Sequence, residues 1–200
     1  TPRQLKKYPV VDDVAINNSS GSAQTSYPGS GKIVHMQPSA DGDNLMGTRG
    51  GSDTGADWSQ VSEVTPDDAT TYYILDVNND ILDVNLESSS NAGISSSDSI
   101  SLIMVGARYA GATASTHQFA LRIKSASGGT TTEVTRPFDT SNTAWASINN
   151  AGNRWQYFLV SYLDPTTGSA WTPTGTNSLD NAQIGIKATD ASPDVYVSTL

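Results

Sequence analysis

From residue 99 onward, the sequence of 200 residues contains short segments in which apolar side chains recur at every second position. The clearest segment spans residues 117–124, where Phe119, Leu121 and Ile123 alternate with polar side chains. A period of two places successive side chains on opposite faces of a β-strand. No window keeps a helical period of 3.6 residues over three turns. The pattern therefore predicts an all-β fold.

Turn signals separate these segments. Gly128-Gly129 predicts a tight β-hairpin after residue 124, and residues 164–168 (Asp-Pro-Thr-Thr-Gly) have the composition of a turn. Residues 99–109 and 155–163 are apolar on both alternating faces, which predicts central strands covered on both sides. Seven or more short strands joined by turns are typical of an antiparallel, jelly-roll-like β-sandwich. We expect this sandwich to carry an extended N-terminal arm.

The first fifty residues differ from the rest in charge and pattern. They hold five of the eleven Lys and Arg residues and only four of the twenty acidic ones. We therefore expect residues 1–50 to form the arm and residues 51–200 to form the sandwich. The basic and apolar residues near the start of the arm are the predicted partner-binding residues. They are Arg3, Lys6, Lys7 and Tyr8.

Composition excludes several classes of function. The absence of cysteine excludes disulfides, thiolate nucleophiles and cysteine-ligated metals. A net charge of −9 argues against general nucleic-acid binding, because neutralising phosphates requires clustered Lys and Arg. No apolar run approaches the roughly 20 residues of a membrane-spanning helix. We therefore expect neither a nucleic acid nor a membrane as partner.

Catalytic constellations are equally sparse. The two histidines are His35 and His117, and no Gly-x-Ser-x-Gly nucleophile turn accompanies them. Most Asp residues fall in turn contexts, where their side chains bond to nearby backbone rather than form acid–base pairs. The sequence thus predicts a protein that is not an enzyme and has no catalytic residues.

One acidic stretch allows a metal site as an alternative. Asp76, Asn78 and Asp80 have the spacing of the first three ligands of an EF-hand loop, and Glu87 falls at position twelve. However, Ile81 replaces the glycine that such a loop needs for its sharp turn. The main expectation is an acidic loop between two strands, with no cofactor, and calcium binding is the alternative.

Aromatic residues suggest a second alternative. Trp145 and Trp171 lie near turns, where an exposed indole could stack on a sugar ring. Packing beneath a loop is the default interpretation of both side chains.

The most distinctive segment spans residues 58–72. It resembles a pattern in structural proteins of tailed bacteriophages, in which an aromatic residue, Val and Glu precede Pro-Asp-Asp, Thr and Tyr. Later elements of that pattern are an Asp-rich segment, a long strand, a hairpin, a Trp-Thr turn and a closing Ile-Gly strand. The resemblance covers roughly residues 56–200. Its members here are Trp58, Val61, Glu63, Pro66-Asp67-Asp68, Thr70 and Tyr72, followed by residues 76–83, 100–109, 119–124, 165–172 and 183–187.

This resemblance implies a jelly-roll-like sandwich without catalytic residues. The implied function is that of a virion structural protein, either a capsid decoration or cement protein or a head fibre, on the surface of a phage particle. The implied partners are the major capsid protein, neighbouring subunits and further copies of the chain. A tail or fibre component involved in host attachment and a carbohydrate-binding module remain the alternatives.

Overall fold

The computed structural model describes residues 32–52, 54–63, 70–111, 117–138, 158–190 and 194–200. The chain divides into two units, Thr1–Ile33 and Val34–Leu200, and the second contains every described strand. Two short 3-10 turns, η1 (Asp57–Val61) and η2 (Leu179–Asn181), are the helical elements of the described residues. The strands are β1 (Pro38–Leu45), β2 (Thr48–Gly51), β3 (Thr71–Leu75), β4 (Ile81–Leu86), β5 (Ile103–Gly106), β6 (Arg108–Gly111), β7 (His117–Lys124), β8 (Thr132–Phe138), β9 (Phe158–Ser161), β10 (Gln183–Asp190) and β11 (Val195–Thr199).

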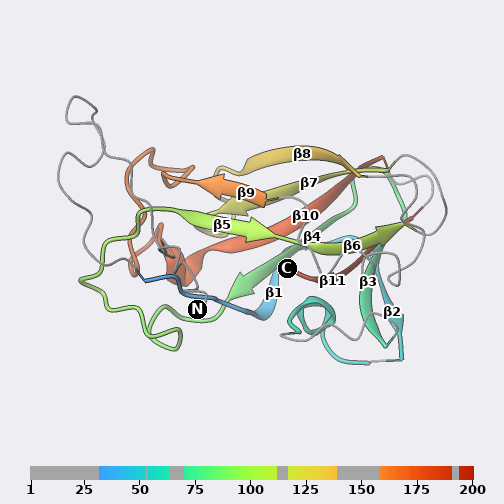
Figure 1. Cartoon of the computed structure of the whole chain (residues 1–200), viewed down its shortest axis with the longest axis horizontal. Coiled ribbons are helices and arrows are strands. Elements are labelled where there is room, and N and C mark those ends of the chain that lie inside the picture. Colours follow the sequence, from blue (N-terminus) through green and yellow to red (C-terminus); the bar gives the residue numbers. More distant parts are fainter. Residues whose placement is uncertain (1–31, 53, 64–69, 112–116, 139–157, 191–193) are drawn as a thin grey trace, which may run out of the picture. The chain divides into compact units, whose positions relative to one another are not determined.

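These strands form three antiparallel sheets (Figure 1). Sheet A has the order β1-β4-β10-β7-β8, sheet B has the order β2-β3-β11-β6, and β5 pairs with β9 in a two-stranded ribbon. Every described pairing is antiparallel. The predicted all-β, antiparallel fold class is therefore confirmed.

A single hydrophobic core joins the sheets. Phe119, Leu121 and Ile123 of β7 are fully buried, as their alternation predicts. The ring of Phe119 lies 4.7 Å from that of Tyr109 in β6, so sheets A and B contact each other across the core. The resulting arrangement is sandwich-like.

Both predicted turns are present where glycine permits them. Gly128 lies in the β7–β8 hairpin with φ of 67°, and Gly168 closes the 164–168 turn with φ of 67°. In that second turn, Asp164 accepts hydrogen bonds from Thr166 N and Thr167 Oγ1. A positive φ is the conformation that glycine adopts most readily, so both turns follow from local chemistry.

The structure differs from prediction in the segment 32–51. Residues 32–36 include Ile33, Val34 and Met36, yet they are not in a strand. Instead β1 and β2 contain residues 41–44 and 48–51, whose Asp, Gly and Asn content indicates turns. β1 is irregular between Asp41 and Leu45, and such bulges tolerate turn-forming residues in a strand. Residues 38–51 therefore belong to the sheets rather than to an arm.

The expectation of a single central strand over residues 99–109 is also wrong. The segment divides at Ala107 into β5 and β6, which follow one another end to end in Figure 1. All four residues of β6 are buried, but Met104 in β5 is 56% exposed. An apolar segment indicates that neither face of the strand carries charge. It does not indicate whether another layer of the protein covers each face.

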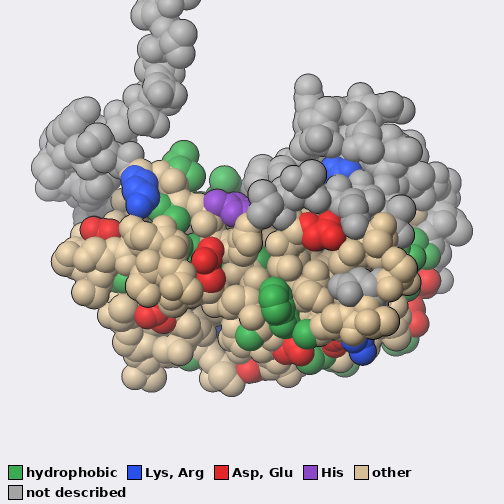
Figure 2. Space-filling model, turned by 90° about the horizontal axis from the view of Figure 1, so that it is seen from below, with side chains coloured by type: hydrophobic (Ala, Val, Ile, Leu, Met, Phe, Trp, Pro, Cys, Tyr) green, Lys and Arg blue, Asp and Glu red, His purple; other side chains and the backbone are tan. Residues whose placement is uncertain are grey.

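The surface reflects the composition. Figure 2 shows one face of the molecule, on which uncharged polar side chains and backbone predominate and only scattered side chains are acidic or basic. Within the described residues, no helix is long and apolar enough to cross a membrane.

Candidate functional site

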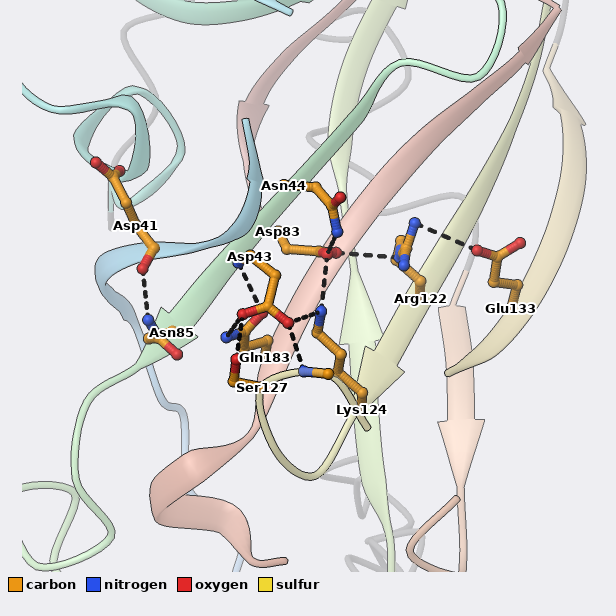
Figure 3. Close-up of polar contacts among 11 residues, drawn as sticks. Asp41, Asp43, Asn44, Asp83, Asn85, Arg122, Lys124, Ser127, Glu133 and Gln183 are labelled. Atoms are coloured by element: carbon orange, nitrogen blue, oxygen red, sulfur yellow. Dashed lines mark hydrogen bonds and ion pairs between the residues drawn. The ribbon is translucent and has the colours of Figure 1, made fainter. Parts of the chain in front are cut away.

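The most connected polar cluster of the described residues lies across sheet A (Figure 3). The register places Asp83 of β4 opposite Gly185 of β10, Gly185 opposite Arg122 of β7, and Arg122 opposite Glu133 of β8. Neighbours of Asp83 and Arg122 along their strands point into the core, so these polar side chains lie on the outer face. We call this row, with Lys124 and Asp43, the charge ladder.

Gly185 makes the ladder continuous. A Cβ atom on this residue would lie 2.3 Å from the Leu82 carbonyl oxygen and 2.5 Å from Asp83 Oδ1. Because β10 has no side chain there, Arg122 reaches across it and places its Nε 3.0 Å from Asp83 Oδ1. The other end of the guanidinium lies 3.3 Å from Glu133 Oε1. One missing side chain thus lets charges on three strands meet.

Lys124 connects the ladder to β1. Its Nζ lies 3.1 Å from Asp83 Oδ2 and 2.6 Å from Asp43 Oδ2. Asn44 Nδ2 donates a hydrogen bond to the same Asp83 oxygen. Asp83 is therefore shared among Arg122, Lys124 and Asn44, and its side chain is only 2% exposed. A carboxylate is tolerated at so buried a position because it is paired and hydrogen-bonded in this way.

Asp43 joins the irregular strand β1 to the β7–β8 hairpin. Ser127 Oγ, Gly128 N and Gln183 Nε2 donate to its carboxylate at 2.7, 2.7 and 2.9 Å. Burial raises the pKa of Asp43, but the hydrogen bond from Lys124 and these three donors outweigh that effect and lower the pKa below its usual range. A carboxylate held in its ionised form acts as a hydrogen-bond acceptor rather than as a general acid.

Counted together with Lys187, the charge ladder has three cations and three carboxylates. Arg122 and Lys124 face Asp83, Asp43 and Glu133, and Glu133 Oε2 also lies 4.0 Å from Lys187 Nζ. Each of the two buried cations contacts two carboxylates. What this geometry does is attach β1, β4, β7 and β8 to one another across the outer face. These contacts hold the edge strand β1 against β4, β7 and the β7–β8 hairpin.

In the predicted calcium loop, the side chain of Asp80 binds the backbone of the loop itself. Asp80 Oδ2 accepts hydrogen bonds from the backbone N–H groups of Val77 and Asp76, at 2.9 and 3.3 Å, within the β3–β4 loop. Asn79 in this loop has φ of 75°. In the described part of the chain, no three or more His, Asp or Glu residues are grouped to hold a metal ion. The loop between two strands is present as expected, and calcium binding stays a prediction.

The two tryptophans proposed for sugar stacking have different outcomes. Trp171 is 2% exposed, and its Nε1 donates to Ser161 Oγ at 3.2 Å. This is the packed alternative, so its ring offers no open face to a sugar. Trp145 lies outside the described residues, as do the predicted partner-binding residues Arg3, Lys6, Lys7 and Tyr8.

Sequence reasoning missed the ladder as a unit. The alternation in residues 117–124 places Arg122 and Lys124 on the outward face, but nothing in it identifies Asp43 or Asp83 as their partners. The available signal was an Asp within an apolar strand segment, Ile81-Leu82-Asp83-Val84. A buried position of this kind requires a cationic partner, although the sequence does not identify which one.

The chain was compared with protein-family models, with curated proteins and with solved structures, and no match was found in any of the three. The Pro66-Asp67-Asp68 part of the phage-like motif lies outside the described residues.

Proposed function

We propose that this protein is a non-enzymatic structural component of a tailed-bacteriophage particle, a capsid decoration, cement or head-fibre protein. The observation that carries the proposal, beside the sequence resemblance, is the order of the strands. That order fits a jelly roll, an architecture used by viral capsid and lectin domains.

The strands can be matched one by one to those of an eight-stranded jelly roll. With the strands numbered along the chain, one sheet of a jelly roll has the order one, eight, three, six, and the other has the order two, seven, four, five. We take β3 as the first strand and treat β5 and β6 together as one interrupted third strand. The jelly-roll sheet of strands two, seven, four and five then corresponds to β4-β10-β7-β8, which is the order within sheet A. The jelly-roll sheet of strands one, eight, three and six corresponds to β3-β11-β6 in sheet B, and the β5–β9 pairing continues that sheet. β1 and β2 are then additional edge strands beside β4 and β3.

The surface supports the same proposal. Only 16% of the residues are charged, and uncharged polar groups predominate on the face in Figure 2. Copies of such a protein can pack closely in a particle with less mutual repulsion than highly charged ones. The charge ladder adds to this picture, because its ions neutralise one another within the molecule.

Quantitative mass spectrometry of purified phage particles tests the proposal. We expect the chain in the particle, at a copy number comparable to that of the major capsid protein. A handful of copies per particle would instead favour the alternative of a tail or fibre component. Absence from washed, intact particles would contradict both assignments.

Deleting residues 1–30 tests the anchoring role of the basic segment. The deletion ends before the second unit, which begins at Val34 and contains every described strand. We expect the truncated protein to keep the thermal melting temperature of the full chain but to be lost from particles in a complementation experiment. The full-length variant with Arg3, Lys6 and Lys7 changed to Glu should also be lost from particles, because it reverses the same basic charges without shortening the chain. If the truncated protein entered particles normally, the anchor would be excluded while the virion role would remain.

The carbohydrate-binding alternative is tested separately. Binding on a glycan array that is lost in Trp145→Ala but retained in Trp171→Phe would support it. No binding to any glycan would remove it without affecting the particle assignment.

A further inference from the structure

The β5–β9 ribbon presents an apolar outward face. Met104 pairs directly with Val160 in the register, and the flanking residues Val105 and Leu159 are buried in the core. The outward side chains are therefore those that alternate with the buried ones. Four large apolar residues at these outward positions of the ribbon and its flanks are exposed, namely Leu102, Met104, Val160 and Tyr162, and Leu163 beyond the end of β9 is exposed as well. We call them the ribbon patch.

The two described segments that form the ribbon patch bring no charged side chain into it. Residues 99–107 and 158–163 contain no Asp, Glu, Lys or Arg, in a chain with twenty acidic and eleven basic residues. On the outer face of sheet A, by contrast, the outward-pointing side chains are the paired charges of the charge ladder. An uncharged face selects an apolar partner, because a charged partner would lose hydration there without gaining a counter-ion.

The size of the patch suits a protein interface. From the exposed fractions, the five side chains present on the order of 500 Å² of surface, near the upper end of apolar patches on monomers, which are often functional. A standard interface buries about 800 Å² per partner, with an apolar centre and a polar rim. Ser99 and Ser101, both exposed beside the patch, are suitable rim residues.

Charge also indicates which partner fits. The chain has a net charge of −9, so acidic side chains of two copies would repel one another wherever they met. The ribbon patch avoids this repulsion. In a two-fold contact the same patch appears on both sides, so apolar area meets apolar area with no charge to desolvate.

We propose that the ribbon patch is the contact surface through which two copies of this chain associate. The β5–β9 ribbon of one copy packs its outward face against the same face of the other. The inference does not rest on the proposed function, because its test uses the purified protein alone.

Sedimentation equilibrium over a range of concentrations tests the association. The wild-type protein should shift from the 21.0 kDa chain mass toward twice that mass as concentration rises. Met104→Glu with Val160→Glu should weaken dimerisation by more than about a hundredfold, because four like charges would meet in the contact. Met46→Glu is the matched control, since Met46 is 53% exposed in the β1–β2 connection, outside the ribbon.

A charge-swap experiment separates self-association from misfolding. The variant Met104→Lys with Val160→Lys should also be monomeric, and an equimolar mixture of the Glu and Lys variants should recover dimers. Unchanged far-ultraviolet circular dichroism and melting temperature verify the fold. A wild-type protein that stays at 21.0 kDa, or a Glu variant that dimerises as tightly as wild type, would overturn the inference. Either result would leave the particle assignment intact, because particle content is measured independently.

Discussion

The outer face of sheet A and the outward face of the β5–β9 ribbon differ in how far their outward-pointing side chains are covered. On sheet A, Arg122 and Lys124 point outward from β7, yet their side chains are only 8% and 5% exposed. On the ribbon, Met104 points outward from β5 and is 56% exposed. The charged residues are thus covered and the apolar residue is open, which reverses the usual preference.

Alternation along a strand therefore identifies its inward positions, but it does not show whether the outward side chains are covered. On sheet A, a missing side chain at Gly185 and an irregular β1 allow Asp83 and Asp43 to enclose the cations. On the ribbon, no described residue performs that role for Met104 and Val160. A covered polar face holds the fold together, whereas an open apolar face is available to a partner.

Removing the shared carboxylate should have the largest effect. Asp83→Ala leaves Arg122 and Lys124 with one carboxylate contact fewer each at a buried position. Breaking a buried ion pair typically costs about 3–5 kcal/mol, and we expect about 3 kcal/mol because Glu133 and Asp43 remain. Urea denaturation of Asp83→Ala, beside the exposed control Asp76→Ala, measures this cost. A loss below about 0.5 kcal/mol, the usual range for surface substitutions, would contradict a structural role for the ladder.

Filling the gap in β10 should have the next largest effect. Gly185→Ala places a Cβ against the Leu82 carbonyl oxygen and Asp83 Oδ1, and we expect a loss of about 1–3 kcal/mol of unfolding free energy. The double variant with Asp83→Ala should lose less than the sum of the two single losses, because the contact with Oδ1 is then absent. Additive losses would mean that Gly185 and the ion pair are independent.

Acidification should have the smallest effect. Because the pKa of folded Asp43 lies below its unfolded value, the unfolded chain binds the proton more tightly. The stability from Asp43 is fully present above the unfolded pKa of about 3.9 and is lost as pH falls through the folded pKa. Asp43→Asn should therefore reduce the slope of unfolding free energy against pH between about pH 5 and pH 2. Parallel pH profiles for the two proteins would exclude this contribution.

Much of the fold could be predicted because its signals are local. Phe119, Leu121 and Ile123 alternate within one strand, and Gly128 and Gly168 mark turns that their own backbone conformation requires. These features depend on residues that are neighbours in sequence.

The candidate sites could not be predicted because they depend on residues distant in sequence. Lys124 meets Asp43 across 81 positions and Asp83 across 41. Likewise, whether Met104 is covered depends on the layers around β5, and an apolar strand segment looks the same in either case. Turn-like residues in β1 became strand residues for the same reason, because β4 supplies their pairing partner.

Methionine oxidation tests the contrast most directly, because the chain provides its own control. Met104 and Met46 are 56% and 53% exposed in the single chain, so both should react at similar rates in dilute protein. At high concentration, the proposed contact predicts that Met104 becomes protected while Met46 stays reactive, as read by peptide mass spectrometry. Equal oxidation of the two residues at every concentration would contradict the ribbon patch as a contact between copies.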